Sequence, residues 1–222
     1  MAKVIVSYDG TDSDRDALAL GRLLTQAGAS IALAYVRHAH EVEASRERLA
    51  EQEAQDLLDA GAAELGDPSI PTHVVLSGST PNGLRDLALE TGAEVLVFGS
   101  EYRTAPGHVD PQASARKLLE GGPIAVALAP AGFHERTGYQ VASVGPVGED
   151  GDPCVLETAQ AIAARLGGSV APQASANVDL MVVGSKPGTV TGRLGIGAAA
   201  EYLIELARCP VIELPRGVAV EF

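Results

Sequence analysis

The stretch Leu96-Val97-Phe98-Gly99-Ser100 is an apolar run that enters a Gly-Ser turn, and it recurs as Met181-Val182-Val183-Gly184-Ser185. Further along each copy, Gly122-Pro123-Ile124-Ala125-Val126 is matched by Cys209-Pro210-Val211-Ile212-Glu213. A repeat of this length exceeds the periods of solenoid arrays. The sequence therefore predicts two duplicated domains rather than an array.

The composition limits the classes of partner. The chain has 222 residues, 46% of them hydrophobic, and a formal net charge of -13. A nucleic acid or an anionic membrane would require clustered Lys and Arg, and no apolar run reaches the roughly 18 residues of a membrane span. Cys154 and Cys209 have no metal-ligand spacing, which fits a reducing compartment. We therefore expect a cytoplasmic protein with no nucleic-acid partner, no membrane partner and no metal centre.

The first half, residues 1–130, alternates strand-like and helix-like patterns. Strands are expected at 4–6, 31–36, 73–76, 95–98 and 124–128, and helices at 11–28, 41–65, 84–89 and 113–119. Strands separated by helices pair in parallel through right-handed crossovers. The fold class predicted for this half is a doubly wound α/β domain with a parallel five-stranded sheet.

Residues 131–136 are interpreted as a linker, and residues 137–222 restart the pattern in shortened form. A strand is expected at 141–144, and a helix begins at Asp152-Pro153, which supplies a cap and a first helical residue. So small a unit would depend on the first half to bury its core. The second half is therefore predicted to be a truncated α/β domain of the same type.

The truncation lies between the second strand and the Gly-Ser turn. Ala171 and Leu180 are only 9 positions apart (180 − 171), whereas Val36 and Val95 in the first half are 59 apart (95 − 36). A parallel crossover needs about a dozen residues. Residues 169–171 are therefore expected to form a return loop, which Pro172 favours, and the alternative is an edge strand that runs the other way.

Ligands of open parallel sheets bind beyond the carboxyl ends of the strands, where strand order reverses. Those ends here carry Asp9-Gly10-Thr11, Val36 and Gly99-Ser100. Together with the opening strand at 4–6, the second Gly-Ser turn and Arg208-Cys209-Pro210-Val211-Ile212, they resemble the universal stress protein family. The resemblance covers almost the whole chain as a tandem pair and implies the adenine nucleotide alpha hydrolase-like fold. It also implies dimer-like docking of strand 124–128 against 211–214 within the chain. Residues 218–220 add a tail strand or mediate further association, such as a homodimer.

ATP-binding members of that family carry glycines at fixed spacing after the fourth strand, followed by Ser or Thr. Glycines let the backbone approach phosphates, which amides and a hydroxyl then bind. In the first copy Gly99 remains, but Tyr102, Gln112 and Ala113 occupy the later positions. In the second copy Gly184 and Gly197 remain, Gly188 keeps the loop flexible, and Pro187 and Ala198 replace a glycine and the hydroxyl. Both copies are therefore interpreted as damaged.

Structural interpretations compete with these functional ones. Each Gly-Ser turn can be a tight strand-to-helix turn without a ligand, and Asp9 can serve the helix start or an adenine or metal site. Asp12, Asp14 and Asp16 are interpreted as helix-start carboxylates, and His38 and His40 as members of a solvated loop. No nucleophile with a paired base is recognisable, so no catalytic residue is predicted.

The leading hypothesis is a tandem universal stress protein that acts as a non-catalytic binding or interaction module with impaired ATP binding. The alternative is that the crevice of the first half binds ATP or AMP. A third hypothesis, from another class, is a weak nucleotide hydrolase. The candidate binding residues are Asp9, Gly10, Thr11, Val36, Gly99, Ser100, Gly184, Ser185, Gly188 and Gly197.

Overall fold

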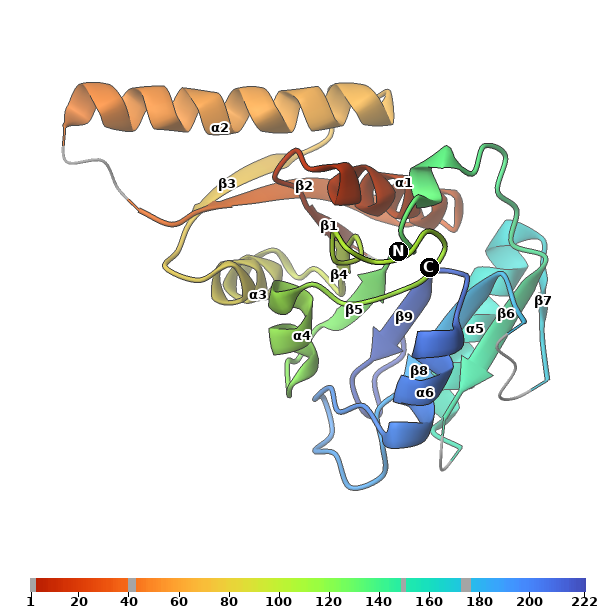
Figure 1. Ribbon diagram of the computed structural model, residues 1–222. Coiled ribbons are helices and arrows are strands. Elements are labelled where there is room, and N and C mark those ends of the chain that lie inside the picture. The colour runs from red at the N-terminus through yellow and green to blue at the C-terminus, as the bar shows by residue number, and fades with distance from the viewer. Residues whose placement is uncertain (1–2, 40–42, 149–150, 173–176) are drawn as a thin grey trace.

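A computed structural model describes residues 3–39, 43–148, 151–172 and 177–222. Its strands form one sheet in the order β3-β2-β1-β4-β5-β9-β8-β6-β7 (Figure 1). The first half supplies β1 (Lys3–Ser7), α1 (Asp12–Gln26), β2 (Ser30–Arg37), α2 (Ala44–Leu65), β3 (Thr72–Leu76), α3 (Thr80–Thr91), β4 (Val95–Phe98), α4 (Ala113–Leu119) and β5 (Ala125–Leu128). These five strands are parallel to one another, which confirms the predicted α/β fold class.

The remaining elements are η1 (Phe133–Glu135), β6 (Ser143–Val147), α5 (Pro153–Leu166), β7 (Ser169–Val170), β8 (Leu180–Gly184), α6 (Ala198–Leu206) and β9 (Val211–Leu214). Counted outward from the centre of the sheet, β9-β8-β6-β7 repeats the arrangement β5-β4-β1-β2. The first half has one further strand, β3, at its outer edge.

The two central strands, β5 and β9, pair with each other, as expected for strands 124–128 and 211–214, and the pairing is antiparallel. Val126 lies opposite Glu213, Ala127 opposite Ile212, and Leu128 opposite Val211. Residues 85 positions apart are equivalent in the two halves, so Ala127 corresponds to Ile212. When each residue is replaced by its equivalent, the pair Val126–Glu213 becomes the pair Val211–Leu128, which is also present. The pairing is therefore twofold symmetric about Ala127 and Ile212.

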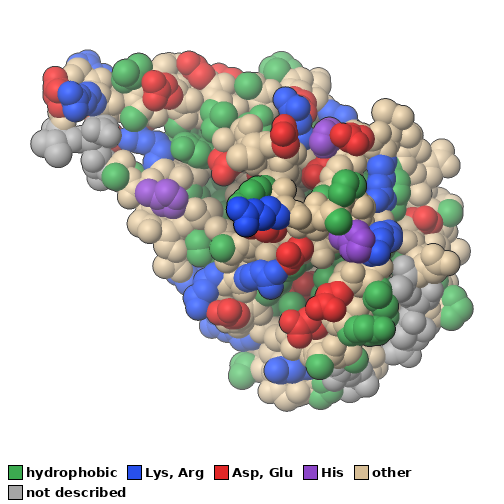
Figure 2. Space-filling view, in the orientation of Figure 1, with side chains coloured by type: hydrophobic (Ala, Val, Ile, Leu, Met, Phe, Trp, Pro, Cys, Tyr) green, Lys and Arg blue, Asp and Glu red, His purple; other side chains and the backbone are tan. Residues whose placement is uncertain are grey.

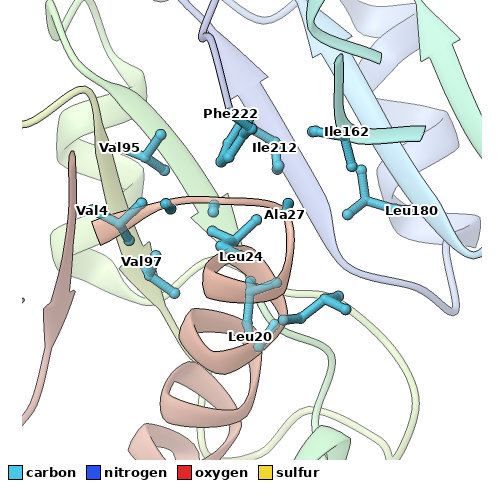
Figure 3. Close-up of a cluster of buried hydrophobic side chains, with 14 of the residues drawn as sticks. Val4, Leu20, Leu24, Ala27, Val95, Val97, Ile162, Leu180, Ile212 and Phe222 are labelled. Atoms are coloured by element: carbon cyan, nitrogen blue, oxygen red, sulfur yellow. The ribbon is translucent and has the colours of Figure 1, made fainter. Parts of the chain in front are cut away.

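Helices cover both faces of the sheet, because its buried strands point alternate side chains to opposite faces. Val4 and Val6 join the core beneath α1, α2 and α5, whereas Ile5 joins the core beneath α3, α4 and α6. The first of these cores contains side chains of both halves. Figure 3 shows Leu20 and Leu24 of the first half together with Ile162, Leu180 and Phe222 of the second. The second half therefore shares its core with the first, as its small size led us to expect.

The expectation for residues 169–171 is wrong. Ser169 and Val170 form β7, which pairs parallel with Ser143 and Val144 of β6, and is neither a return loop nor an antiparallel edge strand. Only β6 lies between β7 and β8 in the sheet, so these two strands are about 10 Å apart. Nine residues separate them in the sequence, and nine residues can span up to about 30 Å. A parallel arrangement of β7 and β8 therefore needs no crossover helix.

Residues 131–136, interpreted as a linker, are held against α1, because the Asp16 carboxylate accepts the backbone N–H groups of Gly132 (2.8 Å) and His134 (2.9 Å). Three further expectations need correction. Asp16 therefore anchors this segment and does not serve the start of α1. Residues 218–220 form no strand; the Val220 N–H donates to the Thr158 hydroxyl at 3.0 Å. The strand expected at 141–144 is β6, which begins at Ser143.

Candidate functional site

The turn Asp9-Gly10-Thr11 lies between β1 and α1, at the carboxyl end of β1. One carboxylate oxygen of Asp14, in the first turn of α1, accepts the N–H groups of Asp9 (2.7 Å) and Thr11 (3.2 Å). A carboxylate is favoured at this place by the unpaired amides of the helix start. Two backbone donors of the predicted site are therefore already occupied.

Asp9 and Asp14 form a close pair of carboxyl groups in this turn. Burial raises the pKa of Asp14 to about 8, and the side chain of Asp9 beside it contributes to the rise. Two carboxyl groups this close place acidic oxygens where a phosphate would approach, and like charges repel. This pair therefore opposes an approaching phosphate.

Val36 and Arg37 end β2, and neither side chain is free for a ligand. Val36 is buried beneath α3, where a Cβ built on Gly83 would lie 3.3 Å from it. The Arg37 guanidinium is held by both carboxylate oxygens of Glu47 on α2, at 3.1 and 3.0 Å. Such a bidentate pair fixes the guanidinium geometrically. The predicted adenine-side position is thus packed, and the neighbouring cation is engaged.

The first Gly-Ser turn, Gly99-Ser100, packs directly on the start of α1. A Cβ on Gly99 would lie 1.8 Å from the Ser13 carbonyl oxygen, so only glycine fits. Ser100 is 1% exposed. Its hydroxyl donates to the Ala129 carbonyl (2.7 Å) and accepts the Asp110 N–H (3.2 Å).

The second Gly-Ser turn, Gly184-Ser185, has the same architecture. The Ser185 hydroxyl donates to the Leu214 carbonyl (2.8 Å) and accepts the Gly195 N–H (3.0 Å). Each partner lies 85 positions (185 − 100) beyond its counterpart in the first half. A Cβ on Gly184 would lie 2.5 Å from Val155 Cγ2 of α5, a side-chain atom rather than backbone. Both turns therefore tie the strand, the following loop and the last strand of their half together.

The loops after the two turns hold the residues that replace the family's glycines. Tyr102 is 74% exposed, and the Arg103 guanidinium carbon lies over its ring, 4.9 Å from the ring centroid. Gly188 has a left-handed φ of 82°, which favours glycine, with open space around its Cβ position. Gly197 is the residue that caps α6, and Gln112 holds the equivalent place before α4. The structure thus separates Gly188, in the exposed loop, from Gly197, at the helix start.

Glu213 is a buried acid that the sequence analysis did not single out. It is 2% exposed, and neither carboxylate oxygen has a hydrogen-bond partner among the described residues. Burial, followed by the charge of Glu201, raises its pKa to about 8. The available signal was a charged residue in the otherwise apolar strand Val211–Leu214. A buried acid without a partner is costly, which marks Glu213 for a functional role.

With this geometry in view, we compared the chain with known proteins. A profile of the universal stress protein family matches residues 1–129. The chain belongs to the universal stress protein family. A search of curated proteins found no match for this universal stress protein.

Solved structures resemble this universal stress protein along nearly its full length. A universal stress protein from Archaeoglobus fulgidus DSM 4304 has a TM-score of 0.71 and 12% identity, and the match covers 97% of this chain and 98% of that one. A functionally unknown protein from Pseudomonas aeruginosa PAO1 has a TM-score of 0.64 and 13% identity over 98% and 93%. A putative universal stress protein from Pseudomonas aeruginosa UCBPP-PA14 has a TM-score of 0.62 and 13% identity over 98% and 94%. At these identities the likeness establishes the fold.

Two kinds of feature are absent from the described residues. No helix among them combines the length and hydrophobicity that a membrane crossing requires. Within the same ranges, no three His, Cys, Asp or Glu side chains gather in a way that could hold a metal ion. His38, for example, lies beside Ser77 and Thr80, with ring nitrogens 3.1 Å from the Ser77 carbonyl and 3.3 Å from the Thr80 hydroxyl. His40 lies outside the described residues.

Proposed function

We propose that this universal stress protein is a tandem of two family units, residues 1–130 and 137–222, joined by residues 131–136. Two observations support the proposal. The strand order outward from the centre repeats in the second half, without the outermost strand. The β5–β9 register and the bonds of Ser100 and Ser185 obey the same 85-residue equivalence. The pairing of β5 with β9 then takes the place of a dimer contact.

We further propose that the protein acts in the cytoplasm, in a stress response, as a non-catalytic binding or interaction module with impaired ATP binding. The observation that carries this proposal is the use of the turn groups within the fold. Both serine hydroxyls bond to backbone of their own half, and Asp14 occupies amides of the Asp9–Thr11 turn. These groups are therefore engaged within the fold rather than free to bind phosphate.

A thermal-shift titration with ATP and with AMP tests this proposal. A ligand at 100 times its dissociation constant adds about 2.7 kcal/mol of stability. We expect neither nucleotide to raise the melting temperature at millimolar concentration. A saturable rise that Asp9→Ala abolishes would support the alternative, a nucleotide site in the first-half crevice, and would refute impaired binding. Arg46→Ala, on the exposed outer part of α2, is the control for nonspecific charge effects.

A further inference from the structure

A pocket of about 560 Å³ lies where the two halves meet, on the face covered by α4 and α6. Its walls include six pairs of residues that are 85 positions apart, among them Arg116 with Glu201, Leu119 with Ile204, and Glu120 with Glu205. The pocket therefore straddles the twofold axis that relates β5 to β9. The loops after the two Gly-Ser turns contribute to its wall, but Asp9 and Gly184 do not line it, and the family resemblance did not predict it.

Acidic groups dominate the rim of this pocket, and acidic side chains gather on the surface between α4 and α6 in Figure 2. The carboxyl groups are those of Asp110, Glu120, Glu201, Glu205 and Glu213, and the cations are Arg116 and Lys186. Arg116 is already paired with Asp110, and Glu120 is paired with Lys117 at 2.9 Å. Acids still outnumber cations in the lining, and a concave site with an excess of one sign of charge concentrates ligands of the opposite sign. The pocket therefore favours a cation.

Glu213 gives this acidic pocket a specific recognition point. It belongs to β9, beside Val126 of β5 and Val183 of β8. The symmetry-related residue is Leu128, which is fully buried and apolar. Strand packing at this position is thus satisfied by a hydrocarbon side chain in one half. The carboxyl group in the other half needs a different explanation, because its oxygens have no partner among the described residues.

Further features of the pocket define the body of the ligand. Leu119, Leu194 and Ile204 are buried side chains in its wall, and they offer hydrocarbon contact. The Thr189 hydroxyl also lines the pocket, and it too is buried without a hydrogen-bond partner among the described residues. A hydroxyl oxygen can accept a second N–H of a ligand cation. A metal ion fits less well, because no metal-binding group of three side chains occurs in the described ranges.

We propose that this pocket binds a small organic monoammonium compound with an apolar body, whose charged nitrogen pairs with Glu213. The ammonium donates to the carboxylate of Glu213 and to the Thr189 hydroxyl, while the apolar body covers Leu119 and Ile204. The other charged groups that face the ligand are Asp110 with Arg116 from the first half, Glu120 on α4, Lys186 in the loop, and Glu201 and Glu205 on α6. This inference goes beyond the proposed function and concerns a different site.

Binding also moves a proton. Burial keeps Glu213 largely protonated at neutral pH, since its pKa is raised to about 8. An ammonium ion favours the ionised carboxylate. The ligand keeps its positive charge, the Glu213 O–H bond breaks, and the proton passes to the buffer. Uptake of one ammonium ion therefore releases up to one proton.

Isothermal titration calorimetry with three probes of similar body tests the proposal: phenethylammonium, neutral 2-phenylethanol and anionic phenylacetate. Each is titrated in two buffers of different ionisation enthalpy, which measures the proton released. We expect saturable binding of phenethylammonium with proton release, and at least about tenfold weaker binding of the other two. Absence of phenethylammonium binding at millimolar concentration, equal affinity for all three probes, or binding without proton release would overturn the proposal.

Matched variants locate the site. Glu213→Gln keeps the shape of the protonated acid, and we expect it to weaken phenethylammonium at least about tenfold and to abolish proton release. Glu201→Gln, at the exposed rim, should weaken binding by about two- to fivefold, and it remains informative if the Glu213 variant fails to fold. Glu53→Gln, on exposed α2, removes an acid away from the pocket and should change nothing. Unchanged affinity in both pocket variants would refute the assignment. Loss of this binding would leave the ATP result untouched, so the two proposals fail separately.

Discussion

The two halves of this universal stress protein keep the same internal bonds and differ in the side chains around them. Ser100 and Ser185 each donate to a carbonyl at the end of the last strand of their half, and each accepts an N–H ten residues further along the chain. Leu128 and Glu213, by contrast, occupy equivalent places with opposite chemistry. The comparison teaches that the repeated motif serves the fold in both halves, while a buried position where the halves meet differs in chemistry.

The loops that follow the two turns show the same division. Thr104 and Thr189 lie 85 positions apart, and the hydroxyl of each is buried with no hydrogen-bond partner among the described residues. Their neighbours Tyr102 and Pro187 are both exposed, and differ in size and flexibility. In these loops the buried threonine is thus kept in both halves, while the exposed residue differs.

The largest expected effect comes from the two turn glycines. Gly99→Ala places a Cβ 1.8 Å from backbone, whereas Gly184→Ala places one 2.5 Å from a valine methyl that can move. We expect Gly99→Ala to lower the free energy of unfolding by on the order of 4 kcal/mol, and Gly184→Ala by about 1–2 kcal/mol. Urea denaturation measures both. Equal losses would show that the two turns are packed alike, against the structure.

Glu213→Leu, which gives the buried acid the side chain of its equivalent residue Leu128, should stabilise the protein. The pKa of Glu213 is raised from 4.5 to about 8, so the folded state holds a proton that the unfolded state releases, and stability falls as pH rises between these values. Glu213→Leu removes that loss and should add about 1–3 kcal/mol above pH 8. The gain should shrink toward pH 4.5.

Denaturation curves across pH measure this gain for Glu213→Leu, with Glu53→Gln as a control for the loss of one exposed acid. A gain that does not depend on pH would mean that Glu213 is not protonated by burial. A loss of stability at every pH would mean that its carboxyl group has partners in the folded protein.

The smallest effect is expected in the exposed loops. Tyr102→Ala removes a side chain that is 74% exposed, and Pro187→Ala changes the equivalent exposed residue of the second half. Each should change the free energy of unfolding by less than about 0.5 kcal/mol. Thermal denaturation measures both variants. A larger loss of unfolding free energy in either variant would mean that the exposed residue packs against the rest of the protein.

Periodicity was sufficient to predict most of the elements. The strand at 95–98 and the helix at 113–119 coincide with β4 and α4, because alternation of apolar runs with amphipathic segments is a local property. β7 was missed, since two residues carry no period and their pairing with β6 is a contact between distant segments.

The candidate site was less predictable. The repeat singles out Gly99 and Ser100, but their contacts with Ser13 and Ala129 depend on the tertiary fold. Pro123 and Pro210, which match in the sequence repeat, are 87 positions apart (210 − 123), whereas equivalent residues of the turns and strands are 85 apart. The sequence alignment therefore does not pair Leu128 with Glu213. The burial of Glu213 follows from the antiparallel contact of β5 and β9, which a four-residue strand does not encode by itself.

The central claim is that both Gly-Ser turns are retained as equivalent structural bonds. The free energies of unfolding of Ser100→Ala and Ser185→Ala test it most directly, with Ser45→Ala on exposed α2 as the control. Each turn variant leaves a buried carbonyl and an N–H without their hydroxyl partner, so we predict losses of about 1–3 kcal/mol that agree within about 0.5 kcal/mol. A clear loss in one variant and none in the other would contradict the account.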